Sequence, residues 1–282
     1  MKKKIALIQM QAVLADVETN YRHAEELMEQ AMEGNPDILV LPETWNTGFY
    51  ISRKLKSIAD EGGKRTETFL SSFAKKHHVN VVGGSAAVLY GNDVYNRSFV
   101  FDREGRKIAE YDKVHGFSYA HEPMYFKGGD HAVSFALDNI SCSMAICYDI
   151  RFPELVRRSV LEGKADLFFI PAAWPKARLF HWTLLGQARA VENQIYLCAV
   201  NQGGISGGTE YAGNSVLLDP WGNDVCRLGT EEGIAFGDID TDILQQIRDT
   251  IHVFRDRRPE IDVVNDYSRR CLMNSLRLKQ KK

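Results

Sequence analysis

Short apolar segments of strand length recur along this chain, and they constrain its fold more than any other feature. The clearest are IALIQM, DILVLPE, VNVVGGS, LFFIPAAW and QIYLCAVNQ. Segments with apolar residues at helical spacing lie between them, over Val17–Met32, Thr66–His78, Pro153–Glu162 and Leu179–Glu192. Strands that alternate with amphipathic helices predict an α/β fold.

The middle and the end of the sequence contain more strands than helices. VYNRSFVFD and KIAEYDK flank a turn at 103–106, and Val133–Leu137 and Ile140–Ile146 flank a turn at 138–139, which predicts two hairpins. SVLLD, DVCRL and GIAFGDID predict three further strands. This surplus of strands disfavours one doubly wound sheet and favours two sheets packed face to face with helices outside.

The charge of the chain argues against one class of partner. The formal net charge is −2, so we expect no broad basic field that would bind nucleic acid. Basic residues crowd only at the C-terminal end, and we interpret that run as a solvated tail. Its members are Arg269, Arg270, Arg277, Lys279, Lys281 and Lys282.

The apolar runs and the cysteines indicate the cellular compartment of the protein. No apolar run approaches the ~20 residues that span a bilayer, and the N-terminal segment lacks the long apolar centre of a signal peptide. We therefore expect a cytoplasmic protein without a membrane partner. The cysteines form no CxxC pair, so neither a disulfide framework nor a structural zinc site is expected. They are Cys142, Cys147, Cys198, Cys226 and Cys271.

Three reactive side chains stand at the ends of predicted strands, where α/β folds place functional sites. Glu43 follows ILVLP, Lys113 follows IAEYD, and Cys147 follows SCSMAI. A helix is predicted to begin near Phe152, so the thiol would lie near backbone N–H groups and a positive helix end. Such a setting favours a thiolate and can hold an oxyanion, and a buried Glu43 would suit a general base.

Each of these residues also has an ordinary interpretation. A free cysteine is commonly buried and inert, and a glutamate or lysine after a strand is commonly a surface group. A cysteine paired with a histidine is the rival arrangement, with His115, His121 and His181 as candidate bases. No single residue decides between the catalytic interpretation and these alternatives.

A series of motifs, taken together, resembles the nitrilase, or carbon–nitrogen hydrolase, superfamily. The motifs run from about Ile5 to about Val263 in the order and spacing of the family: LPETWNTGF, YDKVHGF, HEPMYFKGGD, ICYDIRFPEL, AAWP, ARAVENQ and DPWG. The resemblance implies a four-layer α-β-β-α sandwich in a single domain over 1–266, which agrees with the surplus of strands. The basic tail over 267–282 lies outside it.

The resemblance also implies a catalytic triad of Glu43, Lys113 and Cys147, with Glu122 as a second acidic residue. Glu43 would accept the thiol proton as Cys147 attacks an amide carbon, and Lys113 with the backbone N–H of Tyr148 would hold the oxyanion. Water would then hydrolyse the thioester. This chemistry requires no metal and no organic cofactor.

The residues around Cys147 indicate a branch of the superfamily. CYDIRFPE differs from the CWEN-type sequence of nitrile-cleaving members and resembles the omega-amidase branch. The expected substrate is therefore a small dicarboxylate monoamide such as 2-oxoglutaramate. The alternatives are an N-carbamoyl-amino-acid hydrolase, a general aliphatic amidase or, less in keeping with an intact triad, a non-catalytic partner-binding homologue.

A substrate with a distal carboxylate needs a cation near the sulfur. Arg178 and Lys176 follow the strand LFFIPAAW, and we select Arg178, for which a surface role is equally open. For Arg151 we expect a carboxylate partner inside the fold. Tyr148 and Trp174 are further candidates for substrate binding; Trp45 and Phe117 would either wall the pocket or only pack.

The resemblance finally implies a homodimer or a higher homo-oligomer. A closed twofold dimer is also the commonest oligomer. We expect the contact to involve the helices after Pro153 and near Leu179.

Overall fold

The computed structural model describes residues 1–262. A compact unit extends over Met1–Ile247, and a second unit begins at Arg248. The predicted domain end at residue 266, the tail over 267–282 and Cys271 lie outside the described residues. No helix within the described part is long and apolar enough to cross a membrane.

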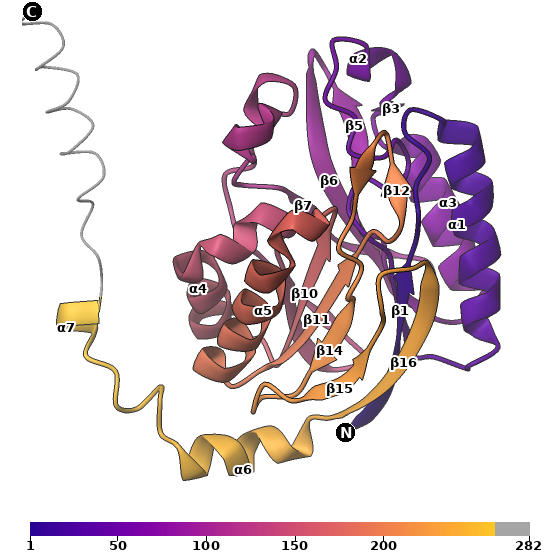
Figure 1. Ribbon diagram of the computed structural model, residues 1–282. Helices are drawn as coiled ribbons and strands as arrows, with labels where there is room; N and C mark the ends of the chain where they lie inside the picture. The colour runs from indigo at the N-terminus through magenta and orange to yellow at the C-terminus, as the bar shows by residue number, and fades with distance from the viewer. Residues whose placement is uncertain (263–282) are drawn as a thin grey trace, which may run out of the picture. The chain divides into compact units, whose positions relative to one another are not determined.

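Two mixed sheets form the centre of the first unit (Figure 1). The first has the order β16-β1-β2-β4-β6-β5-β3, with β7 beside β6. Its strands are β1 (Lys2–Gln9), β2 (Ile38–Val40), β3 (Asp60–Glu61), β4 (Asn80–Val82), β5 (Ala86–Tyr90), β6 (Asp93–Phe101), β7 (Lys107–Asp112) and β16 (Gly233–Asp240).

The second sheet has the order β15-β14-β11-β10-β9-β8. Its strands are β8 (Val133–Leu137), β9 (Ile140–Met144), β10 (Leu167–Ala172), β11 (Tyr196–Asn201), β14 (Val216–Leu218) and β15 (Asp224–Arg227). A separate small hairpin joins β12 (Ile205–Ser206) and β13 (Thr209–Glu210). Both predicted hairpins, β6–β7 and β8–β9, are confirmed as antiparallel pairs.

Helices cover the outer face of each sheet, as Figure 1 shows. Helices α1 (Val17–Met32) and α3 (Lys64–His77) pack on the first sheet, and α4 (Pro153–Gly163) and α5 (Leu179–Asn193) pack on the second. The predicted α-β-β-α sandwich is thereby confirmed. The remaining α-helices of the described residues are α2 (Leu55–Ile58), α6 (Asp242–Thr250) and α7 (Pro259–Asp262).

The central strands are buried on both faces because each sheet lies between helices and the other sheet. Every residue of Ile5–Gln9 and of β2 has no exposed surface, which is the expected environment for uninterrupted apolar strands. Strands β2, β7, β9 and β10 lead to one region of the sandwich, where the residues that follow them meet.

Candidate active site

Lys113 lies at the centre of a buried group of charges. Its Nζ donates to Glu43 Oε1 at 2.8 Å and to Glu122 Oε1 and Oε2 at 3.0 and 2.8 Å. Both glutamates are fully buried and Lys113 is 3% exposed. Glu43 follows β2, Lys113 follows β7, and Glu122 begins a short 3-10 helix, so the fold joins three distant segments here.

Asn96 and a backbone N–H fix the two carboxylates. Asn96, on β6, donates from Nδ2 to Glu43 Oε1 at 2.8 Å and to Glu122 Oε1 at 3.2 Å, and its Oδ1 accepts from Ser85. The N–H of Ala173 donates to Glu43 Oε2 at 2.7 Å. Asn96 is not among the predicted site residues, although an asparagine buried in a strand needs a polar partner.

Cys147 is the first residue of the 3-10 helix η3 (Cys147–Arg151), in a strained turn that follows β9. Its φ is 49°, in the left-handed region that non-glycine residues seldom adopt. Asp149 holds this turn, because its Oδ2 accepts from the N–H of Ile146 at 3.0 Å. Strain of this kind persists where the surrounding structure over-determines it, and it is common at functional sites.

Asp149 is a second residue that the sequence analysis missed. Besides the N–H of Ile146, it accepts from Tyr111 Oη at 2.7 Å and from both the backbone N and Nδ1 of His115 at 2.8 Å. The His115 ring stacks on Phe152 with 3.6 Å between centroids. This network ties the turn at Cys147 to the end of β7.

The charges set the protonation of the site. Burial alone would lower the pKa of Lys113, but the negative charges of Glu43 and Glu122 outweigh it and raise that pKa well above its ordinary value. Burial and the neighbouring Glu43 raise the pKa of the Cys147 thiol, and Lys113 opposes them only in part. In the free site the thiol is therefore protonated and the Lys113 amine is charged.

A cavity of about 220 Å³ opens onto this group. Lys113 and Cys147 form one part of its wall, and aromatic and small side chains with two arginines form the rest. The lining residues are Leu14, Phe49, Lys113, Phe117, Tyr119, Ala120, Cys147, Tyr148, Arg151, Ala173, Trp174, Pro175, Arg178, Ser206, Gly207, Thr209 and Tyr211. The space suits a small molecule and not a polymer.

Two guanidinium groups border the cavity. Arg178 lies 5.1 Å from the ring of Phe117, and Arg151 lies 4.7 Å from the ring of Trp174. Neither forms an ion pair with a carboxylate of the described residues, so the expected internal partner of Arg151 is wrong. Burial lowers the pKa of Arg151, and the nearby charge of Arg178 lowers it further.

Some of the remaining candidate residues line the cavity and others do not. Tyr148, Trp174 and Phe117 line the cavity. Trp45 does not, because it packs 4.9 Å from the ring of Tyr21 in the core. Lys176 pairs with Glu210 at the surface.

Within the described residues, no histidine lines the cavity. His115 bonds Asp149, His181 Nδ1 pairs with Arg151 Nη2 at 3.1 Å, and His121 ends a 3-10 turn. Nor do three His, Cys, Asp or Glu side chains of the described chain gather as a group that could hold a metal ion.

The α-β-β-α sandwich brings an ammonium and two carboxylates together behind a small cavity whose wall also holds a thiol, an arrangement that suits a hydrolase. The chain belongs to the carbon–nitrogen hydrolase family, whose model matches residues 4–249. Over 261 residues it is 40% identical to a 2-oxoglutaramate amidase of Bacillus subtilis, a match that covers 93% of this chain and 100% of that protein.

Solved structures agree with this assignment. A nitrilase-superfamily member of Saccharomyces cerevisiae is 29% identical with a TM-score of 0.84, over 91% of this chain and 97% of that one. A variant of an amidase from Nesterenkonia, with the acetamide moiety of fluoroacetamide on its active-site cysteine, is 27% identical with a TM-score of 0.81, over 92% and 95% of the two chains.

Proposed function

We propose that this enzyme hydrolyses the terminal amide of short dicarboxylate monoamides such as 2-oxoglutaramate, giving the acid and ammonia. One observation carries the proposal. A single small cavity has a buried thiol and ammonium in one part of its wall and two guanidinium groups, without carboxylate partners in the described chain, in another.

In the proposed mechanism Cys147 attacks the amide carbon while Glu43 accepts its proton. The raised pKa of the thiol makes a nearby base necessary. The carbonyl oxygen becomes an oxyanion, held by the Lys113 ammonium and by the N–H of Tyr148, the second residue of η3, where N–H groups have no partner within a helix.

The second half of the reaction removes the acyl group. Glu43 returns its proton to the leaving nitrogen as the C–N bond breaks, and ammonia departs from a Cys147 thioester. Glu43 then takes a proton from water, whose oxygen attacks the thioester carbon; the C–S bond breaks, the acid leaves, and Glu43 returns the proton to the Cys147 sulfur. Glu122 keeps Lys113 charged and in place throughout, because two of its oxygens accept from Nζ.

The distal carboxylate of the substrate would bind Arg178, with Arg151 close by. A planar guanidinium matches a carboxylate with two parallel hydrogen bonds. The names of related proteins support this substrate class, because a relative at 40% identity is a 2-oxoglutaramate amidase. The cysteine adduct in the Nesterenkonia amidase variant supports the role of Cys147 by analogy.

The test is ammonia release from a panel of compounds: 2-oxoglutaramate, 2-oxosuccinamate, a neutral aliphatic amide, a nitrile and an N-carbamoyl amino acid. We expect the two 2-oxo amides to have the highest kcat/KM. Cleavage of the carbamoyl compound with release of carbon dioxide, and none of the ω-amides, would overturn the substrate class and favour the carbamoyl hydrolase.

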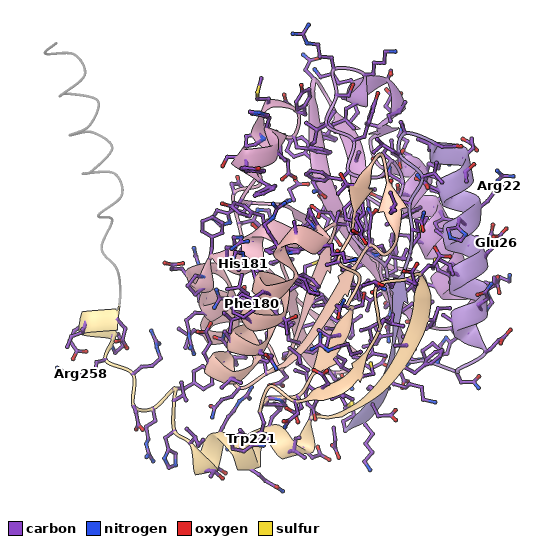
Figure 2. The ribbon with its side chains drawn as sticks, in the orientation of Figure 1. Arg22, Glu26, Phe180, His181, Trp221 and Arg258 are labelled. Atoms are coloured by element: carbon purple, nitrogen blue, oxygen red, sulfur yellow. The ribbon has the colours of Figure 1, made fainter. Side chains whose placement is uncertain are left out.

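We also propose that the enzyme is a homodimer or a higher homo-oligomer that pairs through α5. Large apolar side chains are exposed along one side of this helix: Phe180, Leu184 and Val191 at 72%, 50% and 46%. Trp221 is 47% exposed, on a turn whose Gly222 lies against Val191. Figure 2 labels Phe180 at this helix and Trp221 near the β14–β15 turn. Exposed apolar patches mark interaction surfaces.

The cytoplasm is the compartment that we propose. Cys142, Cys147, Cys198 and Cys226 are free thiols in the described chain. The mechanism needs Cys147 reduced, and cytoplasmic conditions keep thiols reduced.

A further inference from the structure

Tyr211 is a buried tyrosine in the cavity wall that the proposed mechanism leaves unused. It follows β13, is 3% exposed, and lines the same cavity as Cys147 and Lys113. Its hydroxyl makes no hydrogen bond within the described part of the chain and is not enclosed by protein atoms. A buried phenol usually has a hydrogen-bond partner. A molecule that enters the cavity could supply that partner to the Tyr211 hydroxyl.

The backbone places Tyr211 between the two charged parts of the wall. It forms an isolated β-bridge with Pro175, and the next residue, Ala212, donates its N–H to Trp174 O at 2.8 Å. The segment beside it runs from Ala173, whose N–H holds Glu43, to Arg178. Tyr211 thus lies beside the middle of a segment that connects the catalytic carboxylate to the guanidinium.

The charge state of Tyr211 suits a hydrogen-bond donor. Burial raises its pKa, and the neighbouring charge of Glu43 raises it further. The phenol is therefore neutral at neutral pH. Ser206 also lines the cavity, but its Oγ is enclosed in protein.

We infer that the Tyr211 hydroxyl donates a hydrogen bond to the 2-oxo oxygen of the substrate and thereby selects 2-oxo amides over amides that lack this group. The inference rests on the proposed function. In that mechanism Lys113 and Tyr148 serve the amide oxygen, and a guanidinium serves the carboxylate. The 2-oxo oxygen is the remaining polar group of the substrate, and it can only accept a hydrogen bond.

The experiment compares wild type with Tyr211→Phe on two matched substrates, 2-oxoglutaramate and glutaramate, which differ only in the 2-oxo group. Removing a donor from a buried acceptor should lower kcat/KM for 2-oxoglutaramate by roughly 5- to 50-fold, mainly through KM. On glutaramate the change should stay within about twofold, because no partner is lost. Tyr90→Phe, which removes a hydroxyl from a 64% exposed tyrosine, is the matched control and should change neither value.

The outcomes separate this inference from the proposed function. Equal losses on both substrates would overturn the inference, because Tyr211 would then act on the reacting amide or on the fold. So would unchanged kinetics on both. A wild-type enzyme that releases no ammonia from 2-oxoglutaramate would remove the proposed function and this inference together, whereas an active wild type with an unchanged preference in Tyr211→Phe would remove the inference alone.

Discussion

Lys113 carries its charge where almost no water reaches it, and its two glutamate partners make this possible. An isolated buried ammonium would lose its proton. Here two carboxylates surround Nζ within 3.0 Å, and the pKa of Lys113 is raised. The ammonium is thus fixed before substrate arrives, and in the proposed mechanism it needs no reorganisation when an oxyanion forms.

At the other part of the cavity wall, Arg178 gives a prediction about specificity. Arg178→Ala should lower kcat/KM for 2-oxoglutaramate. The corresponding activation free energy should rise by about 1.5–3 kcal/mol, the value of a hydrogen bond to a charged group. A neutral amide of similar length should lose far less, because it presents no carboxylate. Lys176→Ala is the matched control, since Lys176 pairs with Glu210 at the surface. Equal losses of Arg178→Ala on both substrates would take Arg178 out of the site.

The turn at Cys147 is held by one side chain. Asp149 accepts from three other residues and joins the turn to the end of β7. In Asp149→Asn an NH₂ group replaces one acceptor oxygen and faces N–H or O–H donors. We expect a loss of about 1–3 kcal/mol of stability, seen as a lower Tm, together with a lower kcat. The control Asp130→Asn changes a 93% exposed side chain, and a Tm equal to wild type in both variants would contradict this role.

Elements with a strong pattern were predictable from the sequence. The range Val17–Met32 agrees with α1 at both ends, and β6–β7 and β8–β9 form the expected hairpins. The roles of Asn96 and Asp149 were not predicted, because most of their partners are far away in sequence: 53 residues for Asn96 and Glu43, and 38 and 34 residues for Asp149 with Tyr111 and His115. Arg151 was misassigned for the same reason: the sequence contains many carboxylates but does not show which of them reach it.

At the scale of the whole first unit, four charged residues join the two sheets at one end. Arg103, in the β6–β7 turn, donates from Nε to both oxygens of Asp138, in the β8–β9 turn, at 3.0 Å. Lys3 on β1 pairs with Asp138 at 2.7 Å and with Asp37 at 3.3 Å. Burial opposes the charge on Asp138, but Arg103 and Lys3 outweigh it and lower its pKa.

This lowered pKa predicts a pH dependence of stability. A carboxylate whose pKa is depressed in the folded state stabilises the fold above its unfolded pKa of about 3.9, and this contribution is lost as the pH falls toward the folded value. The Tm of wild type should therefore exceed that of Asp138→Asn at pH 7, and the gap should shrink as the pH is lowered below about 4. Glu61→Gln, at an exposed position, should show no such gap. A constant gap between wild type and Asp138→Asn would contradict the ion network.

The proposed oligomer gives a prediction at the same scale. Charges placed by Phe180→Glu with Leu184→Glu on the exposed side of α5 should dissociate it, because a buried unpaired carboxylate in an apolar contact is strongly unfavourable. Light scattering at micromolar concentration measures the mass. Tyr90→Ser, which removes an exposed aromatic ring from the first sheet, should leave it unchanged. A wild type that is monomeric at this concentration would contradict the proposal.

The assignment of Cys147 as the nucleophile is tested by ammonia release from 2-oxoglutaramate by wild type, Cys147→Ala and Cys142→Ala. Cys142 is also buried, on β9, with its thiol donating to Ile140 O. With circular dichroism showing the same fold in all three, the account predicts that Cys147→Ala loses more than about 1000-fold in turnover, as removal of a nucleophile does, while Cys142→Ala keeps turnover close to wild type. Turnover by Cys147→Ala at the wild-type rate would contradict the assignment of the nucleophile and the mechanism built on it.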